Sequence, residues 1–130
     1  MANMTYTGEY LDDMRHGSGV LTSESQTSVS YPDYVYDGQW VLDQREGHGQ
    51  LVTKHDKYSG EFRADKFHGY GVYCGEDGTV YAGDWYKGNR HGTAEMTKRN
   101  GDKFTGEFHQ NQKSGIVSNA ALMFFRLKKS

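Results

Sequence analysis

The sequence predicts an all-β fold, an extended array of stacked β-hairpins. Three observations predict it: a repeated spacing of aromatic residues and glycines, alternation of side chains with a period of two inside each repeat, and turn-forming residues between the alternating stretches. Composition agrees, because 17 of the 130 residues are glycine and 14% are aromatic, while only 35% are hydrophobic. A compact core of aliphatic side chains is therefore not expected.

One pattern occurs five times along the chain. An aromatic residue is followed by glycine two positions later, by a second aromatic after two more, and by another glycine eleven positions after the first aromatic. The first aromatics are Tyr6, Tyr36, Tyr58, Tyr81 and Phe104, and the second aromatics are Tyr10, Trp40, Phe62, Trp85 and Phe108. Such fixed spacing predicts structural units that bury their apolar faces by stacking on one another.

Each unit is predicted to be a β-hairpin. Aromatic and glycine positions two apart lie on one face of a strand. Gly88-Asn89 supplies turn chemistry because both residues tolerate positive φ. The other units place turn-favouring residues at the position of Gly88: Asp13, Asp43, Asp65 and Asn111. Between units, Asp77-Gly78 and Asn100-Gly101 suit two-residue turns, whereas the link from 53 to 57 has no glycine.

The rings are expected to lie over glycines. In the third unit Tyr58, Gly60 and Phe62 share one face, and Ser59 and Glu61 share the other. A ring can cover the bare backbone of a glycine in a neighbouring strand, where a larger side chain would collide. The two sets of aromatics are then predicted to form ladders along the array.

The 130 residues are predicted to form a single domain, with repeats that start near 6, 36, 58, 81 and 104. The polar stretch 22–35 is interpreted as an exposed loop inserted between the first and second units. Segment 118–130 breaks the pattern and is predicted to cap the last hairpin. The sequence leaves three forms of this segment open: a short C-terminal capping helix, a last edge strand, or a segment through which two copies dimerise.

Charge and cysteine content exclude several classes. A net charge of −2 gives no general argument for binding to nucleic acid. The single cysteine, Cys74, rules out an internal disulfide framework and fits a reducing compartment. No run of 18 apolar residues and no secretory type of leader is found. These features predict a soluble protein of the cytoplasm.

Candidate chemical sites have simpler structural explanations. His16, His68 and His91 occupy one repeat position, but equivalent positions in stacked hairpins lie about 10 Å apart, too far for shared metal coordination. Hydrogen bonding to neighbouring backbone is the favoured role of these histidines. The acids Glu9, Glu61, Asp84 and Glu107, with Gln39 in the second unit, are interpreted as a solvated column or as partners of nearby lysine and arginine. Cys74 is interpreted as an incidental strand or turn residue. We therefore expect no enzyme, no metal and no cofactor.

Two binding surfaces are candidates. If the sheet is single-layered, one face of some rings stays open, and a trough that exposes Trp40, Phe62, Trp85 and Phe108 receives a helix or extended peptide of a partner protein. The candidate partner-binding residues are Tyr10, Trp40, Phe62, Trp85, Phe108, Tyr36, Tyr58 and Tyr81. The alternative is peripheral binding to anionic phospholipid. Its candidate residues are Lys66, Lys87, Arg90, Lys98 and Arg99.

The pattern Tyr-x-Gly-x-Trp followed by His-Gly-x-Gly resembles the MORN (membrane occupation and recognition nexus) repeat. The best copies run from Tyr81 to Gly92, from Tyr58 to Gly71 and from Tyr6 to Gly19, and the resemblance spans residues 4 to about 117. The departures are Glu46 and Ser114 at the histidine position, and Ala94 and Val117 at the second glycine. The resemblance implies an elongated, curved antiparallel sheet of stacked hairpins that serves as a non-catalytic scaffold, often at cytoskeletal or membrane-associated structures, and that dimerises in some members.

Overall fold

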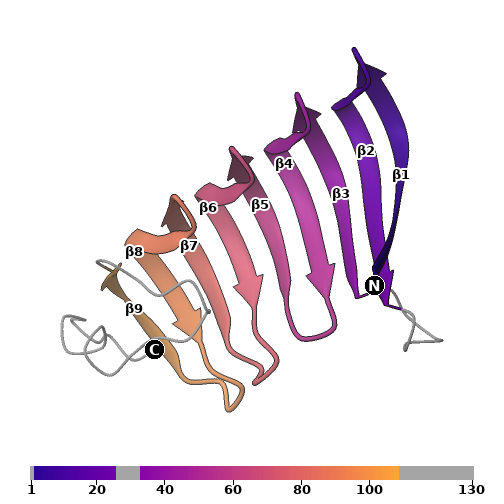
Figure 1. Ribbon diagram of the computed structural model, residues 1–130. Helices are drawn as coiled ribbons and strands as arrows, with labels where there is room; N and C mark the ends of the chain where they lie inside the picture. The colour runs from indigo at the N-terminus through magenta and orange to yellow at the C-terminus, as the bar shows by residue number, and fades with distance from the viewer. Residues whose placement is uncertain (1, 26–32, 109–130) are drawn as a thin grey trace.

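The computed structural model describes residues 2–25 and 33–108. Within these residues the chain forms one open sheet of nine antiparallel strands that neighbour one another in chain order (Figure 1). The predicted all-β sheet of stacked hairpins is thereby confirmed. The strands are β1 (Ala2–Leu11), β2 (Met14–Ser25), β3 (Tyr34–Val41), β4 (Gln44–Thr53), β5 (Lys57–Arg63), β6 (Lys66–Cys74), β7 (Val80–Tyr86), β8 (Asn89–Thr97) and β9 (Lys103–Phe108).

One long edge of the sheet, the turn edge, carries four two-residue turns. Both residues of each turn have positive φ, for example 46° at Leu42 and 69° at Asp43. Positive φ at both positions defines the type I′ turn, whose twist matches that of paired strands. The predicted turn in the fourth unit is one residue too late, because Lys87 and Gly88 form the turn and Asn89 already begins β8.

The opposite edge, the link edge, joins consecutive hairpins. The Gly75 amide donates to the Thr79 carbonyl at 2.8 Å, and the Gly78 amide donates to the Gly75 carbonyl at 3.1 Å. This pattern closes a three-residue loop that ends on Gly78 at a φ of 87°. The predicted two-residue turns at Asp77-Gly78 and Asn100-Gly101 are therefore wrong, since the link at 98–102 has the same pattern. The segment between β4 and β5 is closed instead by the Thr53 hydroxyl, which accepts from the His55 and Asp56 amides.

The predicted inserted loop is too wide at both ends. Strand β2 continues to Ser25 and β3 begins at Tyr34, so several residues assigned to the loop at 22–35 belong to the sheet. Polar residues extend these strands because each has a backbone partner across the ladder, such as Thr22 opposite Val35. Residues 26–32 lie outside the described part of the chain, and so does the predicted cap at 118–130.

A row of glycines crosses the sheet. Neighbours in the row pair directly across adjacent strands, in the order Gly8, Gly19, Gly38, Gly49, Gly60, Gly71, Gly83, Ala94 and Gly106. A Cβ added at Gly71 would overlap the Tyr58 ring, so the predicted packing of rings over glycines is confirmed. In each of the first four units the ladder shifts register just after the first glycine, as between Gly60 and Phe62, which marks a β-bulge.

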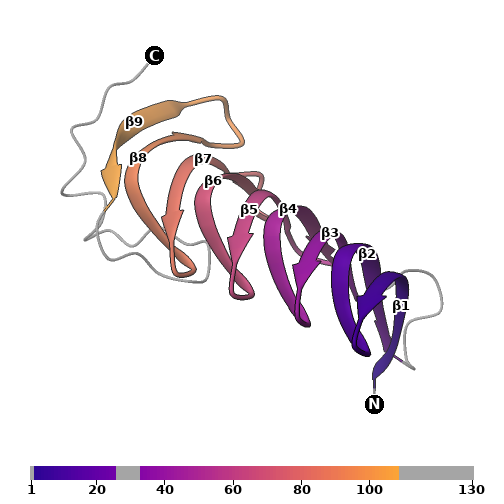
Figure 2. The same ribbon diagram turned by 90° about the horizontal axis from the view of Figure 1, so that it is seen from above.

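The strands bend toward the face that carries the rings. Residues four apart in a straight strand are separated by about 13 Å. The Tyr36 and Trp40 ring centroids are only 5.0 Å apart within one strand. The bulge and the row of glycines therefore let each strand bend over its own rings. The sheet becomes a curved trough, and its arched strands are seen in Figure 2. We call the concave side, which carries the rings, the trough face.

The core is a continuous line of edge-to-face rings beneath this trough. Centroid separations range from 4.9 Å for Tyr81 and Phe108 to 5.6 Å for Tyr58 and Trp85. Each such pair contributes about 0.5–1.5 kcal/mol beyond the area it buries. The line runs through Tyr36, Phe62, Tyr58, Trp85, Tyr81 and Phe108, with Trp40 against Tyr36. A single sheet thus obtains an interior by wrapping around its own aromatic residues. No helix that could cross a membrane occurs among the described residues.

Candidate functional site

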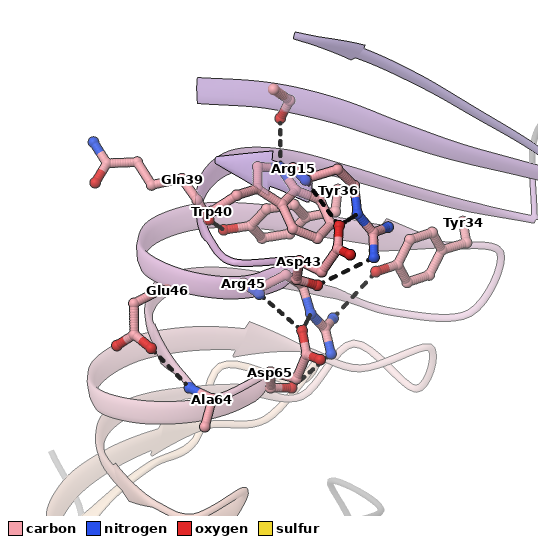
Figure 3. A network of polar contacts seen from close by, with 11 residues as sticks. Arg15, Tyr34, Tyr36, Gln39, Trp40, Asp43, Arg45, Glu46, Ala64 and Asp65 are labelled. Atoms are coloured by element: carbon pink, nitrogen blue, oxygen red, sulfur yellow. Dashed lines mark hydrogen bonds and ion pairs between the residues drawn. The ribbon is translucent and has the colours of Figure 1, made fainter. Parts of the chain in front are cut away.

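Two arginine–aspartate pairs join the first three hairpins on the trough face. The Arg45 backbone amide and Nε both donate to Oδ1 of Asp65, at 2.8 and 3.2 Å, and an Nη donates to the Asp65 carbonyl. Arg15 binds Asp43 in the same way, at 2.8 Å from its amide and 3.0 Å from Nε. In return the turn amide of Asp65 donates to the Arg45 carbonyl at 3.1 Å. We call each such set a turn clamp, and Figure 3 shows both.

The turn clamps also cover the ring core. The Arg15 guanidinium carbon lies 4.5 Å from the Trp40 ring centroid, and that of Arg45 lies 5.1 Å from the Phe62 centroid. Cations over ring faces are attracted to the ring quadrupole. The guanidinium groups therefore close the aromatic core on the trough side while binding the next turn.

The first turn clamp lowers the pKa of Asp43. The hydrogen bond from the Arg15 amide, followed by that from its side chain, stabilises the carboxylate and holds the pKa of Asp43 below its ordinary value. The rings respond to burial, which raises the pKa of the Tyr36 phenol to about 12. Charged groups at the surface and neutral phenols beneath them are thus both favoured near neutral pH.

The third unit lacks the arginine of the clamp. Phe67 occupies the arginine position and stacks on Tyr58 with centroids 3.7 Å apart, while Gly88 occupies the aspartate position. In the fourth unit Arg90 is only 1% exposed and lies over the Tyr81 and Phe108 rings. Burial lowers the pKa of the Arg90 guanidinium. The joint between the third and fourth hairpins is thus aromatic, whereas the two preceding joints are ionic.

A small depression of about 180 Å³ opens on the ionic part of the trough face. Its walls are Arg15, Asp43, Arg45 and Asp65, with Tyr34 at one side and Leu21 and Trp40 at the bottom. Tyr34 is half-buried, and its hydroxyl accepts from the Arg45 guanidinium at 3.2 Å. Fixed guanidinium groups, carboxylates and a phenol ring thus lie side by side in a concave surface.

The expected open ring faces are not found. Trp40, Phe62, Trp85 and Phe108 are at most 3% exposed, and so are Tyr36, Tyr58 and Tyr81. The prediction that the trough exposes the first four is wrong, because the strands bend over these rings and neighbouring side chains cover them, as Arg15 covers Trp40 and Phe67 contacts Trp85. Tyr10 is 59% exposed, since no preceding hairpin among the described residues packs on it. Partner binding by these eight residues remains a prediction.

The histidine position has the expected backbone contact in the first unit. The Leu42 amide of the next turn donates to His16 Nδ1 at 3.4 Å. Glu46, which replaces histidine in the second unit, accepts from the corresponding amide of Ala64 at 3.2 Å. His68 instead lies 5.5 Å from the Tyr86 ring.

The acids that follow the first glycine hold the bulge. Glu9 accepts from the Ser18 amide at 2.9 Å and Glu61 accepts from the Tyr70 amide at 3.2 Å, so these two are backbone caps rather than members of a solvated column. Cys74 is the last residue of β6, as expected of an incidental position. Within residues 2–25 and 33–108 no group of three or more metal-binding side chains is found.

The candidate lipid-binding residues do not form one surface. Arg90 is buried over the rings, whereas Lys98 and Arg99 lie in a loop of the link edge. Only Lys66 and Lys87 lie together, at the turn edge. They line a depression of about 450 Å³ between the third and fourth hairpins. Its other lining residues are Arg63, Ala64, His68 and Tyr86.

The turn clamps were not predicted, although the sequence carries a signal for them. Arginine occurs nine residues after the first aromatic in the first and second units, as Arg15 and Arg45. Aspartate occurs seven residues after the first aromatic in the second and third units, as Asp43 and Asp65. Equivalent side chains on consecutive units are the natural candidates for contacts between hairpins.

Comparison with known families identifies the repeat. The MORN repeat matches five segments of the chain, at residues 6–28, 36–53, 58–80, 81–103 and 104–116. These segments cover most of the chain and begin at the five first aromatics. The chain belongs to the MORN repeat family. This family is non-enzymatic and is generally associated with protein or membrane interaction.

Two curated proteins illustrate the similarity of this MORN protein to its relatives. Alsin from Rattus norvegicus is 36% identical over 83 residues, which are 62% of this chain and 5% of Alsin, and Alsin from Homo sapiens gives the same values. MORN repeat-containing protein 3 from Xenopus laevis is 33% identical over 75 residues, 52% of this chain and 29% of that protein. The matched region is thus a small part of each relative.

Proposed function

We propose that this MORN protein is a non-catalytic scaffold that binds a helix or extended peptide of a partner protein along its trough face. The observation that carries the proposal is the depression over the turn clamps, where Tyr34, Arg15 and Arg45 lie beside the carboxylates of Asp43 and Asp65. Tyrosine and arginine are the side chains most enriched at the energetic centres of protein interfaces.

The curved sheet supports this role because its surface is already ordered. The guanidinium group of Arg15 is fixed by two hydrogen bonds and that of Arg45 by three, so little side-chain entropy is lost when a partner binds. The buried rings serve as the floor that holds these groups in place. This differs from the expectation that the rings themselves touch the partner.

Tyr34→Ala tests the proposal. Partners are captured from cells that express the protein and then purified, and their affinity for each variant is measured. We expect Tyr34→Ala to weaken binding about tenfold, as the truncation of an anchoring aromatic does. Tyr70→Ala is the matched control, because Tyr70 is 58% exposed on the opposite face. Equal affinity of both folded variants, checked by circular dichroism, would overturn the proposal.

A further inference from the structure

The turn edge carries outward-facing side chains that neither the fold nor the trough uses. Each follows a ring in the strand and so points away from the core, as Val41 follows Trp40. The same applies to Leu11, Arg63 and Tyr86. The neighbouring turn residues Leu42 and Lys87 are included because Leu42 is half exposed and Lys87 lines a depression beside Tyr86. With Met14 and Lys66, which pair with Leu11 and Arg63 across their hairpins, these eight residues lie along the turn edge of four hairpins, and we call them the turn strip. Gln44, the partner of Val41, lies between its two halves.

The first half of the turn strip is apolar. It consists of Leu11, Met14, Val41 and Leu42 on the first two hairpins. Leu11 is 46% exposed, Val41 41% and Leu42 50%. Neighbouring exposed apolar side chains of this kind mark interaction surfaces more often than scattered single ones do.

The second half of the turn strip is basic. Arg63, Lys66 and Lys87 line the depression of about 450 Å³ together with Tyr86. Lys87 Nζ lies 5.3 Å from the centre of the Tyr86 ring. Within the part of the chain that the structure describes, none of the three cations forms an ion pair. Three like charges therefore lie around one depression, and the hydrogen bonds place the acid Glu46 near them, where it accepts from the Ala64 amide.

Equivalent positions in the repeat show that this charge is particular to one site. The positions of Arg63 and Lys66 are held by Leu11 and Met14 in the first unit, and by Val41 and Gln44 in the second. The backbone alone therefore does not require cations at these places. The polarity of the turn strip is a property of the side chains, and it gives the row a direction.

We infer that the turn strip binds a segment of a partner protein that is acidic at one end and apolar at the other. The acidic end lies in the depression beside Arg63, Lys66 and Lys87, and the apolar end lies over Val41 and Leu42. This inference rests on the scaffold function proposed above and adds a second docking surface, on the side of the sheet opposite the trough.

Charge distribution favours a protein segment over an anionic membrane. Asp12 and Asp13 lie in the first turn, and Glu46 lies beside the third turn. A flat anionic surface that approached the whole turn edge would meet Asp12 and Asp13 at the first turn and Glu46 beside the third. A linear segment with a directional charge pattern avoids that repulsion.

Hairpin spacing sets the length of the segment. Two strands per hairpin, each about 4.8 Å from the next, give roughly 30 Å from the first turn to the fourth. An extended peptide of about nine residues, or a helix of about 20, covers this distance.

Selection from a phage-displayed library of random 16-residue peptides tests the inference. The full chain is the bait, and enriched peptides are synthesised with a fluorophore for anisotropy measurements. We expect a consensus with acidic residues at one end and apolar residues at the other. In Arg63→Glu/Lys66→Glu/Lys87→Glu, affinity should fall more than about tenfold, because three contacts reverse sign. Val41→Ser/Leu42→Ser should weaken the same peptides.

The matched control is Lys57→Glu/Lys98→Glu/Arg99→Glu, which makes the same charge change at or next to the link edge. Equal loss of affinity in this control, or failure to enrich any such peptide, overturns the inference. Sedimentation of the protein with phosphatidylcholine–phosphatidylserine vesicles would also overturn it, if the turn-strip triple variant abolishes this sedimentation and the control variant retains it. The three cations would then bind anionic lipid. Trough binding that depends on Tyr34 is measured separately and is unaffected by any of these outcomes.

Discussion

At the scale of single residues, the tyrosine that opens each of the first four units has two roles. In the first three units its ring covers a glycine, and in all four its hydroxyl donates to the carbonyl three residues later. The distances are 2.8 Å for Tyr6, 2.9 Å for Tyr36, 2.8 Å for Tyr58 and 3.0 Å for Tyr81. That carbonyl belongs to the bulge, where the ladder within the hairpin shifts and leaves one residue without a partner in the second strand. The hydroxyl therefore stabilises the bend that creates the trough.

Tyr58→Phe isolates the hydroxyl. The ring stays over Gly71, but the Glu61 carbonyl loses its donor, so the free energy of unfolding should fall by about 1–2 kcal/mol. Urea unfolding followed by tryptophan fluorescence measures the change. Tyr70→Phe, at an exposed position, should change it by less than about 0.5 kcal/mol. A Tyr58→Phe value as small as this control would mean that water satisfies the bulge carbonyl equally well.

Acid should release the first turn clamp. Since the pKa of Asp43 is lowered in the folded state, its carboxylate contributes stability above the pKa of the unfolded chain, and that contribution is lost as pH falls through the folded pKa. Asp43→Asn should therefore be less stable than the native chain near neutral pH, and the difference should shrink as pH falls. Urea unfolding between about pH 6 and pH 2 checks this dependence. A difference that stays constant would show that the carboxylate charge does not stabilise the clamp.

At the scale of elements, the hairpins follow from the repeat spacing, whereas their joints do not. The alternation of side chains correctly predicted that the rings share one face. The turn-favouring residues predicted the turns to within one residue of their observed positions. The bulge was missed because the sequence pattern continues through it with a period of two, while the register shifts on one strand only. The burial of Trp40 was missed because its cover comes from the preceding hairpin, through Arg15 and the Gly19 carbonyl, 3.2 Å from the indole nitrogen.

The glycine row sets how closely ring and strand approach. Gly71→Ala places a methyl group against the Tyr58 ring and should lower the free energy of unfolding by about 1–3 kcal/mol, the range for overpacked sites. Ala94 occupies the equivalent position of the fourth unit, so the sheet accommodates one such methyl group after local repacking. Denaturant titration of Gly71→Ala beside Ser59→Ala, an exposed substitution in β5, measures the cost. Unchanged stability would mean that the ring can move at no cost.

At the scale of the whole molecule, each hairpin packs only on its sequence neighbours, as expected of a repeat array. The two tryptophans report on different joints: Trp40 donates to the Gly19 carbonyl and Trp85 to the Gly71 carbonyl. A chain that starts at Asp33 lacks the first hairpin. Of the two tryptophans, only Trp40 loses its cover in this shortened chain. Its fluorescence emission should shift to longer wavelength, and Trp40→Phe in the shortened chain should remove the shift. A blue emission maximum in the shortened chain would show that Trp40 is covered in another way.

The division between the two edges also determines where the chain can change in length. Turn-edge hairpins must keep their spacing, because every clamp, cap and ring contact depends on it. The link segments at 53–57, 75–79 and 98–102 take no part in the turn clamps. Link length already varies along the chain, because the first links are 30 and 22 residues from one unit start to the next and the last two are 23. Foreign sequence, such as an epitope or a whole reporter domain, should therefore be accepted at 98–102 without disturbing either docking surface, whereas one added residue at 42–43 should separate two neighbouring hairpins.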